Sequence, residues 1–289
     1  MTRASPKLVQ VITNLGAGGY NGAKVGAICA AFEKLGARVV LTHTGPSENL
    51  SIDDDASHIC AVGGDGTIRH VAMALERCGR PRPMSIYPGG TVNLLHREAP
   101  APADPSAFAR HVLGAEFPRN CHAVRLNDTL FLACASVGPD SAAVAALSPR
   151  LKRYVGRIAY AYAFATVLWN WKRHPIILEY DGRTVACEAF YVAKSRHFAG
   201  TWSFAPKAQL HDEFFHVVAL SHATRRSDAR FLWLLAIGGT IDRLANAVCF
   251  TCTSLTARSP EPLSVQADGD IVASLPVELS LHPEPIVFH

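Results

Sequence analysis

The fold of the first part of this chain is decided by Val62-Gly63-Gly64-Asp65-Gly66-Thr67. Residues 59–62 are small or apolar, as at the end of a buried strand, and apolar residues recur at helical spacing over 68–75. The glycines therefore lie at a turn from a strand to a helix. Backbone N–H groups in such a turn can approach a polyanion closely, and the amino end of the helix adds partial positive charge. The stretch predicts a phosphate-binding loop.

Asp65 is the acidic member of this loop. A carboxylate beside phosphates would repel them unless a cation lay between, so we expect Asp65 to hold Mg²⁺ directly or through water. Thr67 either caps the following helix or donates to a phosphate oxygen. An ordinary tight turn with a capping threonine is the alternative, but five specified residues in a row argue against it.

Residues 63–67 match the glycine-glycine-aspartate-glycine-threonine signature of one enzyme superfamily. It contains diacylglycerol kinases, sphingosine kinases, NAD kinases and, more distantly, phosphofructokinases. The resemblance implies phosphoryl transfer from ATP and leaves the acceptor open.

Composition and charge narrow the class of protein. The chain has 289 residues, of which 49% are hydrophobic and 18% charged, so we expect an ordered globular protein with one large or two modest domains. The net charge of +4 suits an anionic cofactor or an anionic membrane surface. Nucleic acid would require a denser basic stripe, so no nucleic-acid partner is expected.

The cysteines and the apolar runs indicate which cellular compartment to expect for the protein. The eight cysteines have no framework spacing, which is typical of reduced thiols in a cytoplasmic protein. Cys249 and Cys252 form a C-x-x-C pair, but within a strand they would point to opposite faces, which argues against a zinc or redox site. Residues 1–6 do not resemble a signal peptide, and the apolar run at 158–171 is shorter than the roughly 20 residues of a membrane span.

The first residues predict a strand–helix–strand unit. Leu8 to Thr13 is strand-like, a glycine-rich turn follows at residues 14–19, a helix is expected over 23–35, and Arg38 to Thr42 forms the next strand. The turn is no dinucleotide fingerprint, because Asn21 stands where the third glycine would be. Asn14 and Thr42 match positions that touch nucleotide in lipid kinases. The alternatives are a turn-forming asparagine and a strand-end hydroxyl.

A second glycine turn follows the predicted strand at 83–88. Residues 89–95, Gly-Gly-Thr-Val-Asn-Leu-Leu, open a helix and bring polar side chains to the same end of the sheet. They resemble the Pro-x-Gly-Thr-x-Asn segment of diacylglycerol kinases, and the Gly-Phe-Leu run expected downstream in NAD kinases is absent. A lipid acceptor is therefore preferred. The resemblance assigns nucleotide contacts to Asn14, Thr42, Gly63, Gly64, Asp65, Gly66, Thr67, Gly90, Thr91 and Asn93.

From about residue 122 strand-like runs dominate, and they predict a second domain. The fold class is thus α/β plus all-β: a Rossmann-like α/β domain with glycine-rich nucleotide loops at 1–121, and a β-sandwich domain with helical insertions at 122–289 that supplies the acceptor side. The expected strands cover residues 123–126, 130–137, 176–180, 184–192, 216–220, 247–256, 263–267 and 277–282.

The acidic turn Asp268-Gly269-Asp270 is the candidate for acceptor activation. A turn between two strands explains it without function. In the lipid kinases that it resembles, the turn reads Asp-Gly-Glu, the glutamate being the base and the aspartate lying near metal and phosphates. Transfer to a hydroxyl needs such a carboxylate. Asp270 is shorter than glutamate by one methylene, on the order of 1 Å, which threatens the role of a base.

A second metal site is implied at Asp212. The related kinases carry Asp-Asp-Gly-Leu there and hold a structural Mg²⁺ through the aspartate and neighbouring carbonyls. Glu213 replaces the glycine in this chain, which changes the backbone freedom of the loop.

Two aromatic segments with basic flanks suit contact with anionic lipid, Leu151 to His174 and Phe231 to Ile237. The alternative is that both are helices covering a sheet.

Together these features resemble a diacylglycerol kinase of the bacterial lipid kinase type. We expect a cytoplasmic, membrane-peripheral enzyme that uses ATP and Mg²⁺ to phosphorylate a diacylglycerol-like, sphingoid or ceramide-like hydroxyl, with Asp65, Asp268 and Asp270 in catalysis and Asp65 and Asp212 as metal ligands. An NAD kinase and a catalytically weak nucleotide-binding module are the alternatives, and a homodimer is left open.

Overall fold

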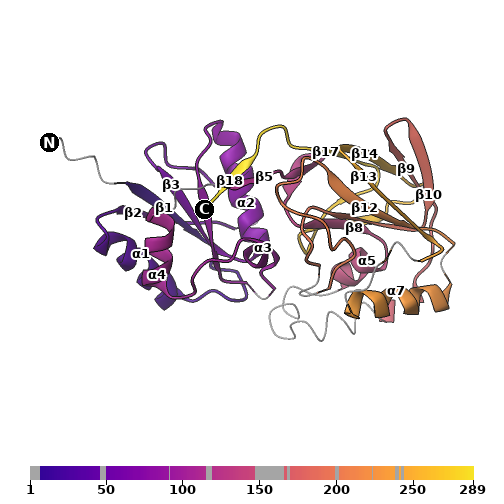
Figure 1. Cartoon of the computed structure of the whole chain (residues 1–289), viewed down its shortest axis with the longest axis horizontal. Coiled ribbons are helices and arrows are strands. Elements are labelled where there is room, and N and C mark those ends of the chain that lie inside the picture. The colour runs from indigo at the N-terminus through magenta and orange to yellow at the C-terminus, as the bar shows by residue number, and fades with distance from the viewer. Residues whose placement is uncertain are drawn as a thin grey trace. The chain divides into compact units, whose positions relative to one another are not determined.

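The computed structural model describes residues 7–45, 50–90, 92–114, 119–146, 166–167, 170–198, 202–222, 224–237, 241 and 244–289. The chain forms two compact units, Met1–Cys121 with Pro285–His289, and His122–Glu284. Figure 1 colours the chain from indigo to yellow along its length. None of the helices in the described ranges combines the length and the apolar character needed to cross a membrane.

The first unit is built on a six-stranded sheet with the order β2-β1-β3-β4-β18-β5. β1 and β3 are buried along their whole length, as expected for central parallel strands, whereas β2 lies at the edge and is half exposed. β2, β1, β3, β4 and β18 are parallel, and β5 is antiparallel to β18. The strands are β1 (Leu8–Thr13), β2 (Arg38–His43), β3 (His58–Gly63), β4 (Met84–Pro88), β5 (Arg119–Cys121) and β18 (Ile286–Phe288).

Helices cover both faces of this sheet. α1 (Gly22–Lys34) packs with α4 (Pro105–Gly114) over one face, where side chains of β1 and β3 join a common apolar core. α2 (Asp65–Cys78) lies on the other side of the sheet (Figure 1). This arrangement follows from right-handed crossovers, because β1 to β2 and β3 to β4 run in opposite directions across the sheet. The predicted Rossmann-like α/β architecture is confirmed.

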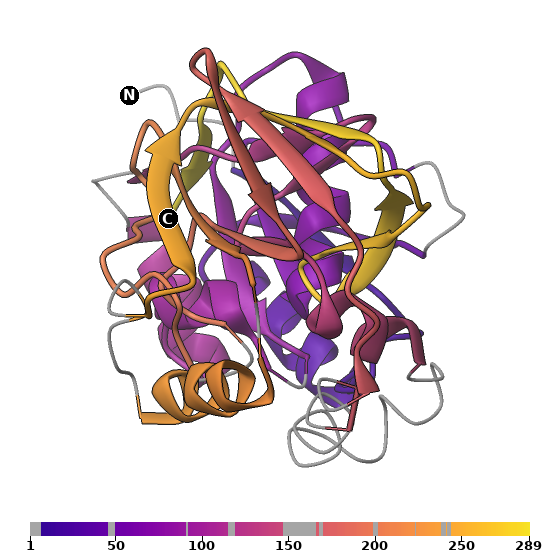
Figure 2. The same ribbon diagram turned by 90° about the vertical axis from the view of Figure 1, so that its right-hand side faces the viewer.

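The second unit is a sandwich of two six-stranded sheets, which face the viewer in Figure 2. All pairings within the two sheets are antiparallel. One sheet has the order β10 (Arg183–Cys187), β9 (Ile176–Tyr180), β14 (Ser254–Arg258), β17 (Val277–Leu281), β6 (Val124–Leu126) and β7 (Thr129–Phe131). The other has the order β13 (Ala247–Cys252), β12 (Phe215–Leu220), β11 (Ala189–Ala193), β8 (Cys134–Val137), β15 (Ser264–Ala267) and β16 (Asp270–Ser274).

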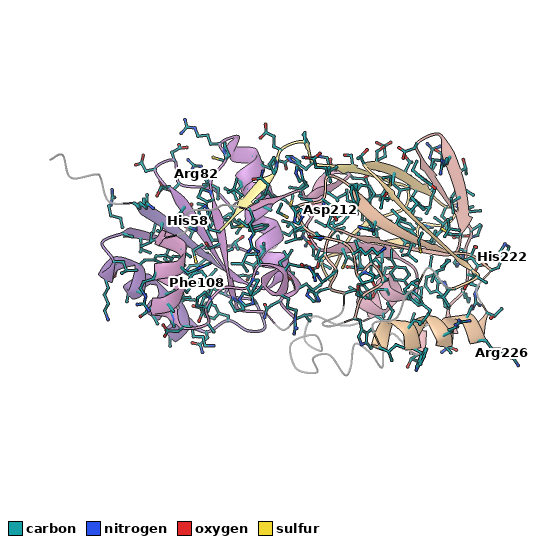
Figure 3. The ribbon with its side chains drawn as sticks, viewed as in Figure 1. His58, Arg82, Phe108, Asp212, His222 and Arg226 are labelled. Atoms are coloured by element: carbon teal, nitrogen blue, oxygen red, sulfur yellow. The ribbon has the colours of Figure 1, made fainter. Side chains whose placement is uncertain are left out.

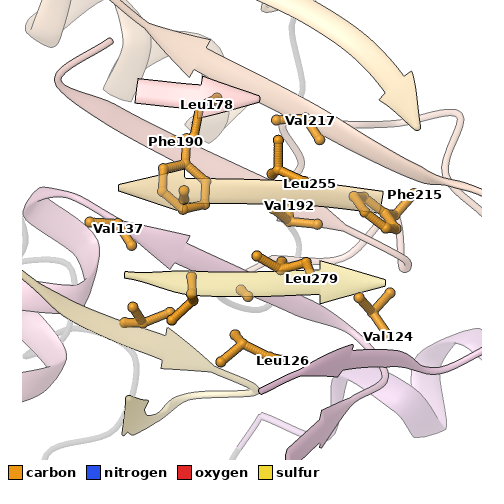
Figure 4. Close-up of a cluster of buried hydrophobic side chains, with 14 of the residues drawn as sticks. Val124, Leu126, Val137, Leu178, Phe190, Val192, Phe215, Val217, Leu255 and Leu279 are labelled. Atoms are coloured by element: carbon orange, nitrogen blue, oxygen red, sulfur yellow. The ribbon is translucent and has the colours of Figure 1, made fainter. Parts of the chain in front are cut away.

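Both sheets contribute to one buried core (Figure 4). Leu178, Leu255 and Leu279 enter it from the first sheet, and Phe190 and Phe215 enter it from the second. The residues alternate with exposed ones in β9 and β17, which is the pattern of a strand buried on one face. The predicted β-sandwich is therefore confirmed.

Several expected strands are divided in the structure. The run at 247–256 becomes β13 and β14, which belong to different sheets, so the chain changes sheet near Thr253. The apolar run in the sequence does not show where the chain passes from one sheet to the other, because the strands on both sides of that point direct side chains into the same core. Cys249 is exposed and Cys252 is buried, as the expected opposite orientation requires.

Residues 285–289 belong to a different unit from the one predicted. The sequence placed residues 285–289 in the second domain, but the structure includes them in the first unit. The reason is that β18 inserts between β4 and β5 and pairs with both. Without β18, β5 would have no neighbour in that sheet.

A buried histidine lies where β18 ends. His58 opens β3 in the first unit (Figure 3), and its Nε2 lies 2.9 Å from Ser85 Oγ of β4. Its ring packs edge-on against the ring of His289, with centroids 5.4 Å apart. Burial, followed by the nearby His289 and Lys7, lowers the pKa of His58 to about 3. The ring is therefore neutral in the folded chain at physiological pH.

We expect His58→Gln to make folding less sensitive to acid. The His58 pKa is about 3 in the folded chain and about 6.5 in an unfolded one, so between these values only the unfolded chain takes up the proton. Stability due to the neutral ring is complete above about pH 6.5 and is lost toward pH 3, by up to about 1.4 kcal/mol per pH unit. Urea unfolding from neutral pH down to about pH 5 measures this slope. Equal slopes in the two proteins would contradict the assignment.

Candidate functional site

Three glycine turns meet at the carboxyl ends of β1, β3 and β4. The Gly89 N–H donates to the Gly63 carbonyl at 2.9 Å. A Cβ on Gly90 would lie 2.5 Å from Gly64 Cα, and one on Gly19 would lie 2.2 Å from the Gly89 oxygen. These distances are too short for any side chain. The glycines thus allow the loops to approach one another, a role that was not anticipated from the sequence.

The amino end of α2 lies among these turns. Gly64 is the N-cap residue and provides no side-chain hydrogen bond to the helix. In contrast, Asn21 caps α1 by accepting from the Lys24 N–H at 3.1 Å. The first N–H groups of a helix without a side-chain cap can bind an anion, and the helix dipole favours negative charge there. Gly66 and Thr67 lie in this first turn.

Thr67 does not act as the helix cap that one of its two predicted roles required. It lies inside α2 and is buried. Its side chain occupies the space next to Gly63, where an added Cβ would come within 2.5 Å of Thr67 Oγ1. The donation of its hydroxyl to a phosphate remains a proposal.

Asp65 connects α2 to the second glycine turn. Its Oδ2 accepts the Leu94 N–H and its Oδ1 accepts the Leu95 N–H, both at 3.0 Å. These N–H groups belong to the first turn of α3 (Leu94–Glu98), so the carboxylate satisfies the amino end of that helix. Burial raises the pKa of Asp65, and the bonds from Leu95 and Leu94 oppose this shift. These backbone partners of Asp65 could not be predicted from the sequence.

Asn14, Thr42 and Asn93 were predicted to contact nucleotide. In the structure each side chain forms a hydrogen bond within the first unit. Asn93 Oδ1 accepts the Gly90 N–H and its Nδ2 donates to the Gly90 carbonyl, both at 2.8 Å. Asn14 Oδ1 accepts the Gly16 N–H at 2.8 Å, so the turn-forming alternative describes it. Thr42 Oγ1 accepts from Gln10 Nε2 at 3.0 Å. Thr91 lies outside the described residues.

Asp268, in the second unit, has a structural role. Its carboxylate accepts backbone N–H groups from Leu132 at 3.0 Å, Ala133 at 2.9 Å and Cys134 at 3.1 Å. The residue is buried and has a φ of 48°, in the left-handed region. Three backbone donors hold both of its oxygens, so we do not assign Asp268 the catalytic role expected from the sequence.

Asp270 differs from Asp268 although only Gly269 separates them. It begins β16 and is partly exposed. The turn before it is fixed by Gln266, whose Oε1 accepts the Gly269 N–H at 2.9 Å. The anchored Asp268 and Gln266 therefore hold a rigid turn that presents Asp270, which leaves Asp270 as the candidate base.

The loop at Asp212 (Figure 3) does not fit a structural Mg²⁺. The ammonium of Lys194 donates to the backbone carbonyls of Asp212 and Phe214, the second at 3.1 Å. A metal ion bound to the same carbonyls would meet this positive charge. Because Lys194 already donates to these carbonyls, we do not propose Asp212 as a metal ligand.

Comparisons with known proteins match both units. A family model described as diacylglycerol kinase catalytic domain matches residues 9–120, and one described as YegS C-terminal NAD kinase beta sandwich-like domain matches residues 133–288. Diacylglycerol kinases of Staphylococcus aureus strains bovine RF122 / ET3-1 and JH9 are each 24% identical over 249 residues, which is 85% of this chain and 76% of each relative. The crystal structure of a diacylglycerol kinase from Bacillus anthracis str. Sterne superimposes with a TM-score of 0.74 at 19% identity, over 99% of this chain and 98% of that one.

We expect Gly90→Ala to destabilise the first unit, because its Cβ would lie 2.5 Å from Gly64 Cα and 2.8 Å from Asn93 Oδ1. The loss in unfolding free energy should be about 1–3 kcal/mol, since backbone must move. Gly26→Ala in α1 is the matched control, because its Cβ would meet nothing within 4 Å, and it should gain about 0.5–1 kcal/mol. Urea unfolding of both variants checks this. A Gly90→Ala protein as stable as wild type would show that the turns do not need their contact.

Proposed function

We propose that this chain, which belongs to the diacylglycerol and NAD kinase family, is a lipid kinase that transfers the γ-phosphate of ATP to a lipid hydroxyl with the help of Mg²⁺. The family models and the diacylglycerol kinase relatives confirm the family resemblance seen in residues 63–67. The observation that carries the proposal is the amino end of α2 without a side-chain cap, surrounded by three glycine turns.

The first unit fits the phosphates of a nucleotide. N–H groups at Gly64, Gly66 and Thr67 begin a helix whose dipole attracts an anion. Gly63 and Gly90 add no side chain of their own where the turns approach one another. Asp65 fixes α3 against α2 through Leu94 and Leu95, so the turns form one rigid frame. A rigid frame of this kind lowers the cost of positioning a phosphoryl donor.

Mg²⁺ would supply charge neutralisation at the phosphates, and Asp65 is the residue that fits it. Each oxygen of Asp65 accepts one bond from the backbone of α3, and a carboxylate oxygen has a second lone pair. Magnesium in kinases takes most of its ligands from phosphates and water and needs only one or two carboxylates. A single carboxylate in the first unit is therefore consistent with the ion.

Asp270 is the proposed base for the acceptor hydroxyl. It lies in a turn held by Asp268 and Gln266, which limits how far its carboxylate can move. Asp268 contributes to the reaction through this positioning and not as a second acid. The general base of such a transfer accepts the hydroxyl proton as the oxygen attacks phosphorus.

α7 (Arg225–Ile237) supports contact with a membrane surface. The exposed residues Arg226, Arg230, Trp233 and Ile237 follow one another at intervals of three or four, so they share one face of the helix. The opposite face buries Phe231, Leu234 and Leu235. Figures 1 and 2 both show α7 outside the two sheets, and Figure 3 labels Arg226 near its start. A stripe of arginine, tryptophan and isoleucine suits anionic lipid. Most of the other candidate segment, Leu151 to His174, lies outside the described residues.

An NAD kinase is the second candidate, because the family model of the second unit names the NAD kinase sandwich. Transfer of label from γ-labelled ATP distinguishes the candidates when diacylglycerol, a sphingoid base, ceramide, phosphatidylglycerol and NAD are offered separately. We expect a labelled lipid on thin-layer chromatography. A labelled dinucleotide without labelled lipid would select the NAD kinase, and no labelled product with any acceptor would overturn the enzyme proposal.

Asp270→Asn should lower the transfer rate by roughly 10²–10⁴-fold, the usual contribution of a general base. Its free energy of unfolding should change by less than about 0.5 kcal/mol, because the side chain is partly exposed. Asp268→Asn is the contrast: it should lose about 1–3 kcal/mol of stability, because buried N–H groups lose an acceptor. Initial rates and urea unfolding separate the two effects. Full activity in Asp270→Asn would refute the assignment of the base, and Asp270→Glu should raise the rate.

Trp233→Glu should weaken binding to vesicles that contain phosphatidylglycerol by at least about fivefold, because it places a negative charge between Arg230 and the bilayer. Val248→Glu is the matched control, since Val248 is an exposed apolar residue of β13, outside α7. Vesicle flotation measures both variants against wild type. Equal loss in the two, or no loss in Trp233→Glu, would rule out α7 as the contact surface.

A further inference from the structure

Lys194 is a buried lysine in the second unit. It follows the last residue of β11, and only 1% of its surface is exposed. Lysine is almost never fully buried unless its charge has partners, because transfer of an ammonium out of water is costly. Its ammonium must therefore have polar partners inside the second unit.

Two backbone carbonyls accept hydrogen bonds from this ammonium. Lys194 Nζ donates to the carbonyl oxygens of Asp212 and Phe214. Both acceptors belong to the segment that enters β12, the strand that pairs with β11. The main chain of Lys194 is also fixed, since its N–H donates to the Ala133 carbonyl at 2.9 Å. The side chain thus joins the end of β11 to the start of β12.

Titratable groups surround the loop that receives this ammonium. Asp212 Oδ2 accepts the Gln209 N–H at 2.9 Å and lies 3.7 Å from His216 Nε2. Burial lowers the pKa of His122, nearby Lys194 lowers it further, and Glu213 raises it. Burial likewise lowers the pKa of His216, Asp212 raises it, and Lys194 lowers it. Lys194 therefore lies among two carboxylates and two histidines whose pKa values are lowered.

Alternating carbonyl oxygens beside a carboxylate are the ligand set of a hard divalent cation. Here an ammonium donates to those carbonyls, and it cannot share them with a second cation without strong repulsion. We infer that Lys194 is the permanent cation of the loop 209–216, and that this loop is stabilised by an ammonium in place of a divalent metal. The second unit should then fold without Mg²⁺ or Ca²⁺. This inference does not depend on the proposed kinase activity.

Thermal unfolding of the full chain without nucleotide or lipid tests the inference. The wild-type midpoint should be the same in chelator, in Mg²⁺ and in Ca²⁺. Lys194→Met keeps most of the side-chain stem and removes the ammonium, so it should lower the midpoint by roughly 4–10 °C. Lys207→Met is the matched control, because Lys207 is exposed in the same segment of chain, and its midpoint should equal that of wild type.

Two results would overturn the inference. One is a Lys194→Met protein as stable as Lys207→Met. The other is a wild-type midpoint that rises with Mg²⁺ or Ca²⁺ and no longer does so in Asp212→Asn. The second result needs no Lys194 variant, so the test stands even if Lys194→Met does not fold. Because no phosphoryl transfer is measured, failure here would leave the lipid-kinase proposal untouched.

Discussion

Close packing of three backbone turns, with no side chain between them, is the constraint on which the first unit depends. The turns after β1, β3 and β4 touch through Gly19, Gly63, Gly64, Gly89 and Gly90. Parallel strands bring their carboxyl ends to one edge, and only glycine lets the turns there come this close. At the same place the amino end of α2 has no side-chain cap. A structural requirement and a binding surface thus arise from the same residues.

Two aspartates in the signature motifs hold the backbone together. Asp65 accepts two N–H groups of α3, and Asp268 accepts three from residues 132–134. A buried carboxylate that receives several backbone donors is a strong anchor, and it fixes the geometry of whatever lies beside it. In each unit the anchored aspartate lies next to the groups proposed to act: the first turn of α2 beside Asp65, and Asp270 beside Asp268. Precise placement of those groups is what phosphoryl transfer requires.

Much of this could be predicted from the sequence because the signals were local. The period of the apolar residues located β1, α2 and most of the sandwich strands, and the glycines located the turns. The partners of Asp65 and Asp268 could not be predicted, because they are backbone groups distant in sequence and carry no side-chain signal. Lys194 was missed for a similar reason: a lysine after an apolar strand is normally exposed, and its carbonyl partners are visible only once β11 and β12 are paired. The change of sheet near Thr253 leaves no mark in an apolar pattern.

The insertion of β18 between β4 and β5 has a consequence for synthesis on the ribosome. Residues 8–88 supply four adjacent strands, but the sheet reaches β5 only when residues 286–288 have left the exit tunnel. The sandwich, in contrast, contains only strands from within residues 122–284. The sheet of the first unit is therefore completed only after the whole of the second unit has been synthesised, which differs from the folding of domains one after another from the amino end. Until then the exposed edge of β4 needs protection from pairing with other nascent chains.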